Sequence, residues 1–157
     1  MKIPHRLSLA LIAIVLPIAT SVAQEHEKKM SRSDLPAAVQ KTVDAQSRGA
    51  TVRGFSVERE NGQTFYEAEL MLNGHSKDVL IDANGAVVET EEQVDLDSLP
   101  AGVKNGLQSK AGSGKLVKVE SITKHDRLVA YEAKVLTNGK KSEVQVGPDG
   151  KPLDHEE

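Results

Sequence analysis

The histidines are the side chains most able to bind a transition metal, and their spacing argues against it. Beyond residue 23 the chain has four of them: His26, His75, His125 and His155. No two stand two or four positions apart, whereas a zinc site needs three or four ligands that converge. The sequence also has no cysteine, which excludes disulfides, thiol catalysis and Cys-ligated metals. We therefore expect neither a metal site nor a cofactor.

Acidic residues offer a second kind of metal chemistry. Asp82-Ala83-Asn84-Gly85 resembles the start of a calcium-binding loop, but Gln93 stands where such a loop needs its bidentate Glu. We interpret the segment as a hairpin turn. The acidic run after it is either a solvated linker or a loose site for a divalent cation, and it contains Glu89, Glu91, Glu92, Asp95 and Asp97.

Carboxylates at alternate positions could act as acid and base catalysts. Glu67 and Glu69 alternate in one expected strand, and Glu132 and Lys134 occupy similar positions later in the chain. Acid–base catalysis needs a carboxyl group in a cleft with a shifted pKa, and nothing in these stretches predicts a cleft. The serines have no partner histidine in a recognisable frame. We therefore predict no catalytic residues and a protein that is not an enzyme.

An internal repeat determines which elements position these side chains. Ser33–Val39 recurs as Asp97–Val103 after 64 residues. Farther along, Tyr66–Ala68 recurs as Tyr131–Ala133 after 65 residues. One unit therefore occurs twice, with a single residue gained between its helix and its second strand. A duplicated small unit without a catalytic constellation is typical of a protein that presents a binding surface.

Each copy has the pattern of a helix followed by antiparallel strands. Apolar residues recur at helical spacing after Leu35 and again after Leu99. Alternating strands follow, separated by turn signals such as Asn73-Gly74. We predict an α+β fold of two tandem repeats, each one α-helix followed by a three- or four-stranded antiparallel β-meander. Whether the two repeats pack as one body is left open.

Two glycines interrupt the second expected helix. Gly102 and Gly106 lie on its apolar stripe, where each costs roughly 1 kcal/mol of helix stability. Either they let the helix approach the sheet closely, or this helix is weaker and frays.

Strand alternation predicts which side chains face outward. The residues that we expect to contact a partner lie on the exposed face of a central strand in each copy: Glu67, Glu69 and Met71, then Glu132 and Lys134. Tyr66 and Tyr131 recur at equivalent positions on the inner face. Core packing with the hydroxyl group at the rim is the favoured interpretation of these tyrosines, and ligand contact is the alternative.

The first residues have the pattern of an export signal. Lys2 and Arg6 precede the apolar run 7–16, and the small residues up to Ala23 resemble a signal-peptidase site. We predict a periplasmic or secreted protein with no stable membrane insertion after cleavage. The expected segments are a signal peptide 1–23, a flexible arm 24–33, a first repeat 34–89, an acidic linker 90–97 and a second repeat 98–157.

The charge of the chain argues against nucleic acid as a partner. The formal net charge is −3, and it becomes −5 without Lys2 and Arg6, whereas phosphate binding needs a basic surface. The charge is also uneven, at −7 over residues 33–96 and +1 over residues 97–157. The first repeat is therefore either a surface that attracts a basic partner or an acidic surface that keeps the protein soluble.

Taken together, these motifs resemble a known family. The stretches that carry the resemblance are Leu35–Val43, Tyr66–Leu72, Val79–Gly85, Leu99–Leu107, Tyr131–Val135 and Val144–Gly150. They are similar to the PepSY-like family, in the branch likened to β-lactamase-inhibitor proteins. The resemblance implies tandem helix-plus-sheet units without catalytic residues. It also implies a sheet face that binds and restrains another exported protein, with a peptidase as the suspected partner.

We therefore expect an exported, non-enzymatic binding protein that restrains a peptidase or another envelope enzyme through a sheet face. The alternative is a periplasmic protein that binds a small ligand or a divalent cation. A thermal shift with divalent cations would distinguish the two, because a ligand that binds only the folded state raises the melting temperature.

Overall fold

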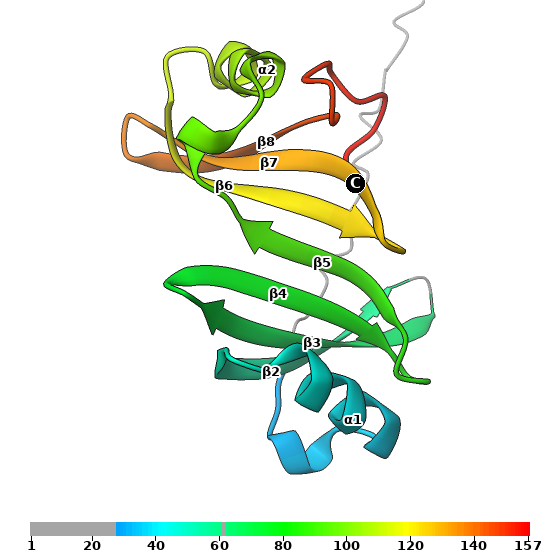
Figure 1. Cartoon of the computed structure of the whole chain (residues 1–157). Helices are drawn as coiled ribbons and strands as arrows, with labels where there is room; N and C mark the ends of the chain where they lie inside the picture. The colour runs from blue at the N-terminus through cyan, green and yellow to red at the C-terminus, as the bar shows by residue number, and fades with distance from the viewer. Residues whose placement is uncertain (1–27, 61) are drawn as a thin grey trace, which may run out of the picture.

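One antiparallel sheet of eight strands runs through the residues that the structure describes, 28–60 and 62–157. In this computed structural model the predicted signal peptide, residues 1–23, lies outside the described residues. The strands lie side by side in sequence order (Figure 1). Their bounds are β1 Lys28–Lys29, β2 Thr51–Glu60, β3 Gln63–Leu72, β4 His75–Asp82, β5 Val87–Gln93, β6 Lys115–Lys124, β7 Arg127–Thr137 and β8 Lys140–Val146.

Two α-helices accompany the sheet, and the predicted α+β fold class is confirmed. The helices are α1, Ala37–Gln46, which precedes β2–β5, and α2, Ala101–Ala111, which precedes β6–β8. Strand β5 pairs with β6 from Glu89 opposite Lys124 to Gln93 opposite Glu120. The strands after the two helices therefore belong to one continuous sheet. The duplication of the unit stays a prediction from the sequence.

Two segments differ from their expected organisation. The acidic linker predicted over 90–97 is wrong in its first half, because β5 extends to Gln93 and is paired on both sides. In the predicted arm 24–33, β1 pairs with the edge of β2, and the 3-10 helix η1, Arg32–Asp34, follows it. Residues 24–27 lie outside the described residues. Both segments are held in the sheet by pairing with neighbouring strands, although their local sequence has the pattern of a solvated segment.

Each helix begins directly after a proline and buries one apolar stripe. Proline fits this position because its fixed φ suits the first turn and its missing N–H has no partner there anyway. Val39 and Val43 of α1 are buried, as are Val103 and Leu107 of α2. Each pair is spaced by one helical turn, so one side of each helix faces the sheet.

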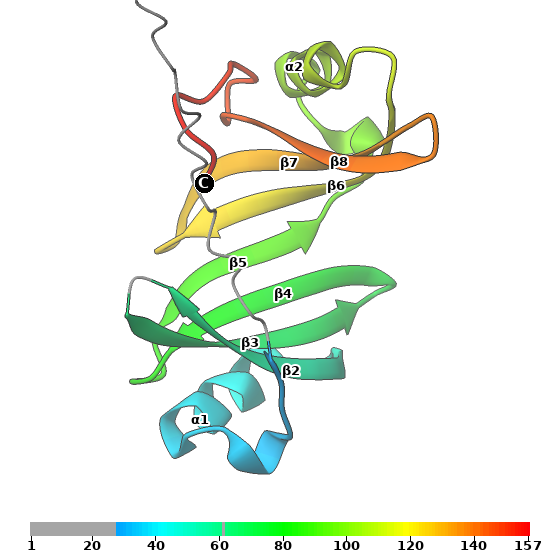
Figure 2. The same ribbon diagram turned by 180° about the vertical axis from the view of Figure 1, so that it is seen from behind.

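Both helices cover the same face of the sheet. Residues directly opposite each other on neighbouring strands lie on the same face of the sheet. Val79 of the first apolar core is opposite Thr90 of β5, and Thr90 is opposite Thr123 of β6, so all three share one face. Alternation along β6 puts Thr123 on the same face as Val119 of the second core. Figures 1 and 2 show α1 at the β2–β4 end of the sheet and α2 at the β6–β8 end.

We call this side of the sheet the covered face, and the other side the open face. The covered face carries the apolar residues of both cores, among them Phe55, Ala68, Val79, Val119 and Ala133. The open face carries acidic residues at the intervening positions, among them Glu67, Asp78, Glu91, Glu120 and Glu132.

The glycines of α2 make a close contact rather than a frayed helix. A Cβ added to Gly106 would lie 2.1 Å from the carbonyl oxygen of Gly150, in the turn after β8. Gly150 itself has a φ of +81°, and a Cβ there would lie 2.2 Å from the carbonyl oxygen of Gly102. Only residues without a Cβ allow the helix and this turn to approach so closely.

Candidate functional site

All five residues that we expected to contact a partner lie on the open face. Glu67, Glu69 and Met71 come from β3, and Glu132 and Lys134 come from β7. They are half-buried rather than fully exposed. Strands β4, β5 and β6 separate the two groups, so the structure does not join them into one cluster.

The open face is hollowed around β3 and β4, although nothing in the sequence of these stretches predicted a cleft. One cavity of about 360 Å³ and another of about 380 Å³ share two lining residues, Glu67 and Asp78. Glu69 and Met71 line the second cavity together with Lys118. The predicted residues of β3 therefore border a depression, whereas Lys134 borders a separate hollow near β8.

The tyrosines belong to the other side of the sheet. Tyr66 packs against the core beneath α1, and Tyr131 packs against the core beneath α2. Both are half-buried, and neither lines the two cavities described above. Their positions support core packing and give no support to ligand contact in these hollows.

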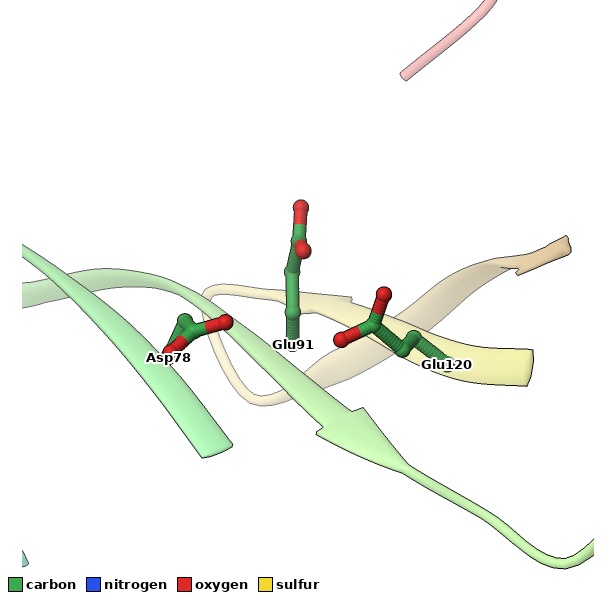
Figure 3. A group of neighbouring side chains, drawn as sticks. All are labelled: Asp78, Glu91 and Glu120. Atoms are coloured by element: carbon green, nitrogen blue, oxygen red, sulfur yellow. The ribbon is translucent and has the colours of Figure 1, made fainter. Parts of the chain in front are cut away.

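Three carboxylates that the sequence analysis did not group together converge on the open face. They are Asp78 from β4, Glu91 from β5 and Glu120 from β6, and one ligand atom from each lies within 4.8 Å of the others. Asp78 is directly opposite Glu91, while Glu120 lies on the next strand (Figure 3). Figure 3 shows Glu91 between the other two side chains.

Burial and mutual repulsion make two of these carboxyl groups weak acids. Burial, followed by the neighbouring Glu67, raises the pKa of Asp78 to about 6. Burial, followed by the charge of Glu120, raises the pKa of Glu91 to about 8. Burial also raises the pKa of Glu132, although a hydrogen bond from Gln145 Nε2 at 2.9 Å acts in the opposite direction. Ionised carboxylates are thus costly on this face.

Glu120 is the most buried acid of the group, and its two oxygens differ in their partners. Its exposed fraction is 1%. Oε1 lies 2.5 Å from Lys118 Nζ and accepts a hydrogen bond from Ser76 Oγ at 3.4 Å. Oε2 has no hydrogen-bond partner among the described residues, and the ammonium group of Lys134 lies 3.7 Å from it. One oxygen of a buried carboxylate is therefore left incompletely satisfied.

Lys134 is held in this environment by the acids around it. Burial lowers the pKa of its ammonium group, but the charges of Glu120 and Glu143 outweigh burial, so the pKa is raised overall. Lys134 therefore remains protonated, and its charge offsets part of the negative charge beside β6 and β7.

The last residues of the chain also contact the open face. The backbone N–H of Glu157 donates to Gln145 Oε1 at 2.9 Å, and the Glu157 carboxylate lies 3.3 Å from Lys124 Nζ. Glu157 and Lys124 both line the cavity of about 360 Å³. The segment after β8 thus brings one further carboxylate to the rim of the acidic depression.

Comparisons with known proteins place the fold. No protein-family model and no curated protein matches the chain. Among solved structures, a DUF2874 family protein from Bacteroides ovatus has a TM-score of 0.60 at 24% identity, over 76% of this chain and 85% of that one. A candidate periplasmic protein from Bacteroides eggerthii has a TM-score of 0.61 at 20% identity, with coverages of 76% and 86%.

A third similar structure is a BLIP-like protein from Bacteroides fragilis. Its TM-score is 0.55 at 21% identity, over 76% of this chain and 83% of that one. Within residues 28–60 and 62–157, no helix is long and apolar enough to cross a membrane. The Bacteroides eggerthii protein is described as a candidate periplasmic protein. At these identities the chain shares the fold of these proteins, and its function has to be argued from its own residues.

Proposed function

We propose that this chain is an exported, non-enzymatic protein that binds a partner protein on the open face of its sheet. The observation that carries the proposal is that the two faces of the sheet are covered differently. Helices α1 and α2 pack on one face, whereas the other face has hollows lined by half-buried charged side chains. A partner of ordinary interface size would cover such a face. Side chains that are already partly desolvated give it fixed polar positions to recognise.

The charge of the open face favours a partner with a basic segment. Carboxylates outnumber bases around the two cavities, where the basic residues are Arg53, Lys118 and Lys124. Complementary charge accelerates association and selects the orientation of a complex more than it adds affinity. We therefore expect a lysine- or arginine-rich segment of the partner to lie over β3–β5.

The resemblance to PepSY-like proteins makes an exported peptidase the first partner to test. We also infer that the two helix-plus-strand units are copies of one another. A pair of matching contacts supports this: a Cβ at Gly85 would lie 2.8 Å from the Ala38 carbonyl oxygen, and Gly150 approaches the Gly102 carbonyl in the same way. Gly150 and Gly102 follow their counterparts by 65 and 64 residues, which are the repeat offsets.

The test is an affinity capture with charge-reversed variants. The wild-type protein, a Glu67→Lys/Glu69→Lys variant of the open face, and an Asp44→Lys/Glu92→Lys control would each be immobilised and exposed to envelope extract. The control changes the net charge equally but at exposed sites away from the open face. Circular dichroism would establish that all three are folded.

We expect a basic exported protein to bind the wild type and the control, and to bind the open-face variant at least about tenfold more weakly. Inhibition of a captured peptidase by the free protein would support the restraining role. Equal binding to all three proteins would contradict the assignment of the open face.

A further inference from the structure

We infer that Asp78, Glu91 and Glu120 form a binding site for one divalent cation of about the size of calcium. This inference does not rest on partner binding, because it concerns only side chains of this chain. It also differs from the two metal sites considered from the sequence. The turn at Asp82 takes no part in it, and Glu91 is the single member of the acidic run 89–97 that belongs to it.

The spacing of the three carboxylates fits an ion bound by oxygen. Two oxygens that both lie 2.3–2.6 Å from a calcium ion can be at most about 5 Å apart, and two that bind magnesium at 2.0–2.1 Å at most about 4 Å. One ligand atom from each of the three residues lies within 4.8 Å of the others, so calcium can contact all three with little movement. Carboxylate oxygens are also the ligands that such hard cations prefer.

The sheet holds these ligands in place before any ion binds. Asp78 and Glu91 are direct cross-strand neighbours in β4 and β5, and Glu120 comes from β6, which pairs with β5. All three strands are paired on both sides within the sheet, so their backbones are fixed by hydrogen bonds. Preorganised ligands lose little conformational entropy when they bind.

A second, independent observation points to a missing ligand. Oε2 of Glu120 is buried without a hydrogen-bond partner among the described residues, although the exposed fraction of Glu120 is only 1%. Buried polar atoms in native proteins are nearly always hydrogen-bonded, and the ion pair with Lys134 at 3.7 Å is too long to supply such a bond to Oε2. Figure 3 shows the Glu120 carboxylate turned toward Glu91, and Asp78 lies on the other side of Glu91. An ion between the three would supply the absent partner.

The charge of the site leaves room for a cation. Lys118 and Lys134 form ion pairs with Glu120. Across the described ranges, no ion pair within 4.0 Å joins a base to Asp78 or to Glu91. Two like charges directly opposite each other weaken a sheet, so this pair gains most from a positive charge placed between them. Burial is the largest cause of the raised pKa of Glu91, and the charges of the neighbouring acids, Glu120 first, add to it.

The test is calcium binding to the purified protein after removal of ions with EGTA, followed by isothermal titration calorimetry and thermal denaturation. Magnesium chloride is the matched salt control. Glu91→Gln removes the central ligand and keeps the volume of the side chain. Glu92→Gln is the control variant, because Glu92 is the next residue of β5, is exposed, and lies on the covered side of the sheet.

We expect about one calcium ion per chain, a melting temperature that rises with calcium and falls again with EGTA, and a weaker response to magnesium. The Glu91→Gln variant should lose at least about tenfold in affinity, and the Glu92→Gln variant should stay within about twofold of the wild type. Because Gln keeps the volume of the side chain and carries no charge that its acidic neighbours would repel, we expect this variant to stay folded, and circular dichroism would check that it does. No heat and no melting shift up to about 10 mM calcium, or equal binding by Glu91→Gln, would overturn the inference.

Discussion

The two faces of the same sheet are built from opposite chemistry. On the covered face the cross-strand neighbours are apolar, for example Phe55 with Ala68, and they are buried beneath the helices. On the open face Asp78 stands directly opposite Glu91, and Glu120 stands opposite Glu132. Like charges in such positions are destabilising, whereas apolar pairs contribute roughly 0.2–1 kcal/mol each.

This difference indicates that the two faces have different roles, one in stability and the other in binding. The covered face supplies the stability of the fold through burial and close packing. The open face departs from the rules of sheet stability at neighbouring positions on several strands, and such departures in natural proteins gather at functional sites. Substitutions on one face at a time should therefore have different effects, large on the covered face and small or pH-dependent on the open face.

The largest effect should come from the core of the covered face. Leu107→Ala removes a fully buried side chain between α2 and the sheet, and we expect a loss of about 4 kcal/mol in the free energy of unfolding. The measurement is urea denaturation followed by circular dichroism. Leu136→Ala is the matched control, because Leu136 lies on the open-face side of β7 with an exposed fraction of 38%. Comparable losses for the two variants would contradict the comparison.

The next effect should come from the close contact between α2 and the turn after β8. Gly150→Ala places a Cβ against the backbone of Gly102 at a positive φ, and we expect a loss of about 3 kcal/mol. Gly49→Ala separates the two causes, because Gly49 has a similar φ of +78° but has nothing within 4 Å of an added Cβ. Its loss should be about 1 kcal/mol, from backbone strain alone. Thermal and urea denaturation would measure both, and equal losses would show that the approach of α2 is unimportant.

On the open face, stability should depend on pH in the absence of divalent cations. Glu91 has a folded pKa of about 8, above its ordinary value of 4.5, so its contribution is complete below about pH 4.5 and is lost as the pH rises through 8. Asp78, with a pKa of about 6, acts in the same direction. With EGTA present, we expect the free energy of unfolding to fall by about 2 kcal/mol between about pH 5 and about pH 9.

Glu91→Gln should remove most of this slope and should be more stable than the wild type at about pH 9. Urea denaturation at a series of pH values is the measurement. A variant that keeps the slope of the wild type would assign the pH dependence to other groups.

The smallest effect should come from an ion pair outside the open face. Lys77 Nζ lies 2.8 Å from Glu92 Oε1, and the Glu92 side chain is half-exposed. Such pairs contribute little because water screens them, so Glu92→Gln should change the free energy of unfolding by less than about 0.5 kcal/mol. A larger loss, measured by the same denaturation assay, would show that the surface of the covered side contributes more than packing predicts.

The sequence predicted the fold class and the facing of individual strands well, because both depend on local periodicity. Alternation along β3 separated Tyr66 and Ala68 from Glu67 and Glu69, and the structure places them on opposite faces. The helical stripes after Leu35 and Leu99 predicted α1 and α2. The close contact of α2 was one of two alternatives, since the sequence does not reveal that the turn at Gly150 lies against Gly106.

The acidic cluster could not be predicted because it depends on pairing between strands. In β5 every residue from Glu89 to Gln93 is polar, so the segment has the pattern of a solvated linker rather than a half-buried strand. Its strand identity comes from β4 and β6 on either side. A shift of one residue in either register would turn Glu91 to the other face, and no local signal fixes that register. Asp78 and Glu120 lie far apart in the sequence, and no motif connects them with each other or with Glu91.

A thiol-protection measurement can show whether the open face is the binding surface. The chain has no cysteine, so a Glu69→Cys variant and a Glu92→Cys variant each carry one reactive thiol, on the open and covered sides respectively. The rate of thiol modification would be measured for each variant alone and in complex with its captured partner. We expect slower modification of Glu69→Cys in the complex and an unchanged rate for Glu92→Cys. Protection of Glu92→Cys without protection of Glu69→Cys would contradict this expectation.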